Sequence, residues 1–86
     1  MNAAVLAYCH TLPEPLNLFA YMTWRRWIQP QHIHSCEWWC NNLEDDAKPD
    51  WLVTLGQRSG AYPPAPLEVI VDEARERLIQ LLRGEP

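Results

Sequence analysis

Eight prolines divide this 86-residue chain into five apolar segments, and so limit the length of any element it can form. A proline inside a helix removes a backbone hydrogen bond and clashes with the preceding turn, so helices start at prolines or end before them. Hydrophobic residues make up 48% of the chain, which is enough for one core at this length. We therefore predict an all-α fold, a compact bundle of four to five short helices that forms a single domain over residues 1–86.

The clearest helical pattern is the last one, from about Pro66 to Arg83. Its apolar residues recur at spacings of three and four and fall on one helical face: Leu67, Ile70, Val71, Ala74, Leu78, Leu81 and Leu82. Gly84 follows, as glycine often does at the end of a helix. We expect a long C-terminal amphipathic helix whose apolar face is buried.

Four shorter helices are expected before it, over about residues 3–11, 15–28, 30–43 and 49–55. The 15–28 segment is apolar on two opposite sides, which predicts a central helix enclosed by its neighbours. One side holds Leu16, Ala20, Trp24 and Trp27, and the other holds Leu18, Phe19 and Met22. Gly56 should end the helix that begins near Pro49. The proline-rich stretch within residues 57–65 should be a loop with extended geometry.

The helix expected over residues 30–43 places two adjacent tryptophans, Trp38 and Trp39, on different faces. A buried seam is predicted along one side, because Ile33, Cys36, Cys40 and Leu43 recur at helical spacing, with Trp39 beside it. Trp38 lies more than about 140° around the helix from that seam. It should therefore be exposed on a polar face, together with His34, Asn41 and Asn42, while Trp39 belongs to the core.

Charge and composition disfavour several classes of function. A net charge of −4 argues against nucleic acid as a partner, although Trp24-Arg25-Arg26-Trp27 combines aromatic and basic residues as single-strand binders do. No apolar run is long enough to span a membrane, and the first residues lack the basic stretch of a signal peptide. We therefore expect a cytoplasmic protein, with no membrane partner and with reduced cysteines.

Histidines and cysteines suggest one alternative function. His32, Cys36 and Cys40 lie at helical spacing, and Cys9 and His10 could complete a set of four zinc ligands. The tight pair of cysteines that opens most zinc modules is missing, and free cysteines commonly serve as small core residues. We expect buried thiols and no cofactor, with a small zinc-binding protein as the alternative.

No set of residues has the composition of a catalytic site, so the chain is predicted not to be an enzyme. We expect a small protein-interaction module of the adaptor, inhibitor or assembly-factor type, such as a phage or another mobile element could encode. Its partner would be another protein, or a second copy in a homodimer. The predicted interaction site consists of Trp38, His34, Asn41 and Asn42, rimmed by Glu44, Asp45 and Asp46. A further alternative is an acidic mimic, whose carboxylates block the nucleic-acid-binding surface of a partner.

Overall fold

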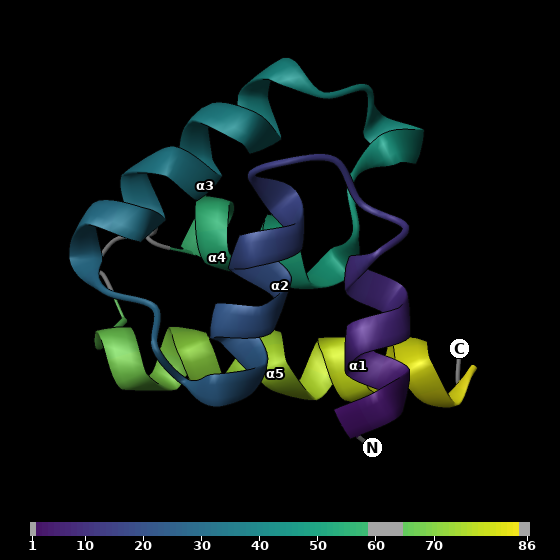
Figure 1. Ribbon diagram of the computed structural model, residues 1–86. Coiled ribbons are helices and arrows are strands. Elements are labelled where there is room, and N and C mark those ends of the chain that lie inside the picture. The colour runs from purple at the N-terminus through teal and green to yellow at the C-terminus, as the bar shows by residue number, and fades with distance from the viewer. Residues whose placement is uncertain (1, 59–64, 85–86) are drawn as a thin grey trace.

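The computed structural model describes residues 2–58 and 65–84, and these residues form helices without any strand (Figure 1). The elements are α1 (Asn2–Cys9), α2 (Leu16–Arg25), α3 (Pro30–Asn42), the short 3-10 helix η1 (Asp45–Ala47), α4 (Asp50–Arg58) and α5 (Leu67–Arg83). The predicted all-α bundle with a long C-terminal helix is thus confirmed. Most of the predicted proline-rich loop falls on residues 59–64, which lie outside the described residues.

The bundle has the dimensions of a compact domain. Its Cα radius of gyration is 11.9 Å, and a folded domain of this length is expected to have about 12 Å. Among the described helices, none is long and apolar enough to cross a membrane.

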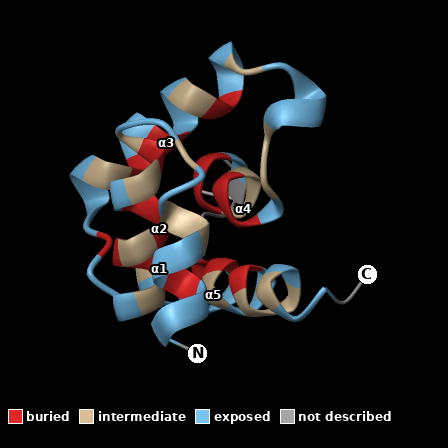
Figure 2. Cartoon of the chain, turned by 45° about the vertical axis from the view of Figure 1, so that its right-hand side comes forward, coloured by how far each residue is buried: buried red, intermediate tan, exposed pale blue. Residues whose placement is uncertain are grey.

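The centre of the bundle is α4, which packs against α3 on one side and α5 on the other (Figures 1 and 2). Trp51, Leu52 and Leu55 of α4 are fully buried. The indole Nε1 of Trp51 donates a hydrogen bond of 2.9 Å to the Tyr8 hydroxyl, which ties α1 to the core. The prediction that the 15–28 helix is central was therefore wrong: α2 packs on α1 and α5, and its Leu18 is exposed.

Gly56 lies inside α4, not at its end, and the prediction of a stop there was wrong. A Cβ atom at this position would lie 2.6 Å from the Cys40 sulfur and 2.9 Å from the Cys36 carbonyl oxygen. Glycine is needed because the backbones of α3 and α4 approach closely here. The constraint is a contact with another helix, which no pattern within residues 49–58 reveals.

A left-handed residue ends α2 earlier than predicted. Arg26 has φ 57°, and its N–H and that of Trp27 donate back to carbonyls of the last turn. This is the Schellman arrangement that usually carries glycine. Trp27 therefore leaves the helix and is exposed, instead of sharing a helical face with Trp24.

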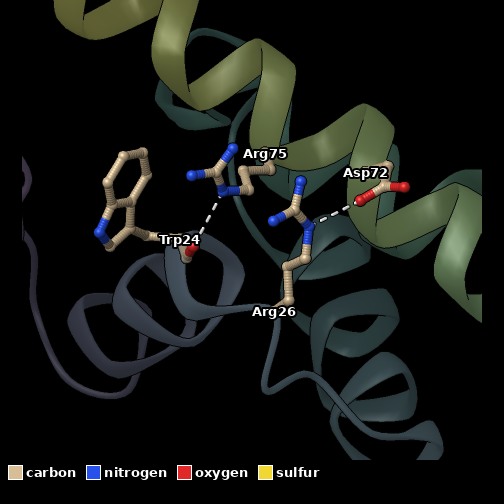
Figure 3. Close-up of polar contacts among 4 residues, drawn as sticks. All are labelled: Trp24, Arg26, Asp72 and Arg75. Carbon is tan, nitrogen blue, oxygen red and sulfur yellow. Dashed lines mark hydrogen bonds and ion pairs between the residues drawn. The ribbon is translucent and has the colours of Figure 1, made fainter.

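Polar contacts fasten the end of α2 to α5 (Figure 3). The guanidinium of Arg75 stacks over the Trp24 ring at 4.2 Å, and its Nε donates to the Trp24 carbonyl oxygen at 2.9 Å. Beside it, Arg26 forms an exposed ion pair of 2.8 Å with Asp72. The Trp24 indole donates to the Asn2 side chain at 2.9 Å, so α1 is tied to the same joint.

The apolar face of α5 is buried as predicted along its centre, where Ile70, Val71, Ala74 and Leu78 belong to the core. Leu81 was also predicted to be buried and is instead exposed. It lies in the last turn of α5, which ends at Arg83. Gly84 ends the helix in the left-handed conformation, as predicted.

Candidate protein-interaction surface

Trp38 projects from the outer side of α3, and 56% of its surface is exposed. Its neighbour Trp39 is half-buried and packs against the core. The two rings meet edge to face, with centroids 5.0 Å apart and planes at 81°. The predicted exposure of Trp38 is confirmed, whereas Trp39, predicted to be buried, packs on the edge of the core and is only partly buried. Trp39 supports one side of the exposed indole and restricts its movement.

The other predicted residues of α3 lie along the same outer side. His34, Asn41 and Asn42 are all exposed. The Asn42 amide donates a hydrogen bond of 2.7 Å to the Trp38 carbonyl oxygen, one turn back in the helix. His34 also lines a groove of about 270 Å³ between α3 and the start of α5, together with Glu37 and Ile70.

The predicted acidic rim follows directly at the C-terminal end of α3. Glu44 precedes η1, Asp45 and Asp46 begin it, and all three are exposed. Lys48 forms a 3.1 Å ion pair with Asp45, but only 14% of the lysine side chain is accessible. The rim therefore presents carboxylates to solvent and largely hides its one cation. We call Trp38, His34, Asn41, Asn42 and Glu44–Asp46 the Trp38 surface.

The acidity of the chain is concentrated in this region. Between Pro30 and Asp50 the sequence has five carboxylates and one lysine, which amounts to the whole net charge of −4. Acids and bases balance over the rest of the chain. The segment that exposes Trp38 is therefore also the electronegative segment of the chain.

The proposed zinc ligands do not converge. Among residues 2–58 and 65–84, no three histidines, cysteines or acids are placed to share a metal ion. His32 is engaged at the start of α3, where its Nδ1 accepts a hydrogen bond of 2.8 Å from the Gln29 N–H. Cys9 and His10 lie apart from α3, beside a groove between α1 and α2. The geometry of the described residues does not support the zinc alternative.

The cysteines of α3 are buried, in keeping with the predicted seam. Burial, with a smaller contribution from Cys40, raises the pKa of Cys36 to about 12. Burial likewise raises the pKa of Cys40, whose thiol donates to the Leu52 carbonyl oxygen at 3.1 Å. Burial therefore holds both thiols in the protonated form at neutral pH in the metal-free protein.

The aromatic-basic run at the end of α2 is also explained by internal contacts. Arg25 lies over the Trp27 ring at 4.8 Å, and Arg26 is paired with Asp72. Both cations are exposed, but each is held by a group of the same chain. This arrangement provides no concentrated basic face of the kind that nucleic-acid binding requires.

One surface feature was missed from the sequence. A groove of about 470 Å³ runs between α1 and α2, with Leu6, Cys9, Leu18 and Tyr21 as its main apolar lining. The only signal for it was the second apolar side of the 15–28 segment, which was assigned to the core. We call this feature the α1–α2 groove.

Comparisons with protein-family models, with curated protein sequences and with solved structures find no match for this chain.

Proposed function

We propose that the protein is a non-enzymatic interaction module, of the adaptor, inhibitor or assembly-factor type, that binds another protein through the Trp38 surface. The observation that carries this proposal is the exposure of Trp38 beside the packed Trp39. Tryptophan is enriched among the residues that dominate binding energy in interfaces. Here it forms an apolar centre within polar side chains, which is the usual anatomy of an interface.

The charge of the region favours a partner of a particular kind. Five carboxylates in the segment that carries Trp38, with one largely hidden lysine, would attract a basic surface that has an apolar pocket for the indole. We also place the module in the reducing cytoplasm, where its three free cysteines are stable.

The same charge favours the acidic mimic as a second candidate. In that case the carboxylates would carry most of the affinity and Trp38 little of it. Binding would then weaken steeply as salt is raised, because exposed charges are screened. An interface centred on Trp38 would lose only part of its affinity under the same conditions.

The test compares Trp38→Ala with Leu81→Ala, which truncates an exposed apolar residue on α5. Affinity capture from the source cell would identify the partner, and calorimetry with the purified partner would give the affinities. We expect Trp38→Ala to weaken binding by about 2 kcal/mol or more and Leu81→Ala to have little effect. Equal affinities for the two variants would contradict the proposal.

A further inference from the structure

The α1–α2 groove is lined by two leucines that the described residues leave about half exposed. Leu6 of α1 is 49% exposed and Leu18 of α2 is 55% exposed. Exposed leucines are normal when they are scattered singly. These two instead line one open apolar groove of about 470 Å³.

The apolar strip continues beyond the groove. Tyr21 lines the groove and also meets the exposed Trp27 ring edge to face, with centroids 5.9 Å apart. Six large hydrophobic residues are exposed in the described part of the chain, and three of them lie along this strip: Leu6, Leu18 and Trp27. The strip is thus the main concentration of exposed apolar side chains, and it is separate from Trp38 on α3.

The charges at the two ends of the strip have opposite signs. Glu14 lines the groove just before α2 begins, and Arg25 is exposed in the last turn of α2. Leu18 follows Glu14 by four residues, and Tyr21 precedes Arg25 by four. The order acid, leucine, tyrosine, base is therefore symmetric in spacing about the midpoint between Leu18 and Tyr21.

This symmetry determines which occupant fits. If a second α2 lies antiparallel to the first, a two-fold axis through the midpoint brings Glu14 of each copy to Arg25 of the other. The same axis places Leu18 against the second copy's Tyr21. Leu18, Tyr21 and Arg25 lie within α2 at the spacings of three and four at which one helix packs on another, and Glu14 lies in the turn that leads into the helix. A two-fold dimer requires such a self-complementary patch.

We propose that the α1–α2 groove binds a second copy of the chain, so that the protein forms an antiparallel two-fold dimer. The α2 ridge of each copy lies in the α1–α2 groove of the other, and the two ion pairs fix the direction. The contact involves only two short helices from each copy, which indicates an interface at the small end of the stable range and a reversible dimer. This inference does not depend on the Trp38 surface.

The first experiment is sedimentation equilibrium of the full chain from about 1 to 500 µM, the range in which small reversible interfaces assemble. The variants are Leu18→Ser and, as a matched control, Val69→Ser, which changes an exposed apolar residue outside the groove. We expect the native chain and Val69→Ser to dimerise, and Leu18→Ser to dissociate at least about tenfold more readily. Circular dichroism checks that both variants keep their helices.

The second experiment tests the ion pairs by charge reversal. Arg25→Glu would place two carboxylates together at each end of the interface and should weaken the dimer about three- to tenfold at low salt. Adding Glu14→Arg to that variant restores opposite charges and should restore the dimer. Arg25→Glu also removes the stacking on Trp27, but the double variant shares that loss, so the difference between them isolates the pair.

Three results would overturn the inference. One is a native chain that stays monomeric throughout the range. Another is a dimer that Leu18→Ser and Val69→Ser weaken equally. The third is a double reversal that binds no better than Arg25→Glu alone. A Trp38→Ala variant should dimerise like the native chain, so failure of the partner-binding proposal would be seen separately.

Discussion

Gly56→Ala gives the sharpest test of how α3 and α4 pack. In an ordinary helix interior this change stabilises, because alanine favours the helix over glycine by about 1 kcal/mol. Here the new methyl group would lie 2.6 Å from the Cys40 sulfur, 2.9 Å from the Cys36 carbonyl oxygen and 3.1 Å from the Cys40 Cβ atom. We therefore expect the opposite sign.

The size of the stability loss depends on which of the atoms that contact the new methyl group can move away. The Cys40 sulfur can rotate away, but the Cys36 oxygen belongs to the backbone of α3 and shifts only with the helix. Overpacking of a core costs about 1–3 kcal/mol, and a backbone contact belongs in the upper part of that range. After the gain in helix propensity, the net loss should be about 1–2 kcal/mol. A domain of this length is stable by about 4–13 kcal/mol, so the variant should still fold.

Thermal unfolding followed by circular dichroism measures this directly, and Tm should fall by about 5–15 °C. Cys40→Ala in the same background removes the nearest atom. The variant that carries both Gly56→Ala and Cys40→Ala should therefore lose about 1 kcal/mol less free energy of unfolding than the sum of the two single-variant losses. A Gly56→Ala variant that melts at a higher temperature than the native chain would refute the close approach of α3 and α4.

Three further outcomes are expected. Leu78→Ala should lower the free energy of unfolding by about 2–4 kcal/mol in chemical denaturation, because Leu78 is fully buried in α5, and a loss below about 0.5 kcal/mol would contradict its burial. A thiol reagent at pH 8 should modify half-buried Cys9 well before Cys36, whose pKa of about 12 and burial keep it protonated and covered, and equal rates in the folded protein would count against this. Asp72→Asn should cost less than about 1 kcal/mol, because its ion pair with Arg26 is exposed, and that cost should vanish at about 1 M salt.

The sequence pattern within a single helix predicted which of its residues are buried and which are exposed. The spacing of apolar residues located α5 and the α3 seam, since a helix with one apolar stripe has one way to bury it. The same rule separated exposed Trp38 from packed Trp39. Each of these results depends on the position of a residue around its own helix.

The features that were predicted wrongly depend on contacts or dihedral angles that such spacing does not encode. Gly56 was taken as a stop because glycine serves both at helix ends and at close approaches, and only the position of α3 distinguishes the two. Trp27 was placed on the face of Trp24 because a helical wheel assumes continuous helix. An arginine in the left-handed conformation is uncommon, so nothing in the run Trp24–Trp27 signals that α2 ends there.

The error over the central helix has a different origin. A helix that is apolar on two sides needs a packing partner for each side. The prediction assumed that other helices of the same chain pack against both sides. Residues of both sides of α2 are buried, Leu16 and Ala20 on one and Phe19 and Met22 on the other, whereas Leu18 is exposed. Of the second side, the described part of the chain leaves Leu18 exposed. In the proposed dimer the α1–α2 groove of the second copy covers Leu18, so this part of the pattern would describe quaternary packing. The stability of the Leu18→Ser monomer distinguishes these cases: with Leu18 55% exposed within its own chain, the monomer should lose far less stability than truncation of a fully buried leucine costs.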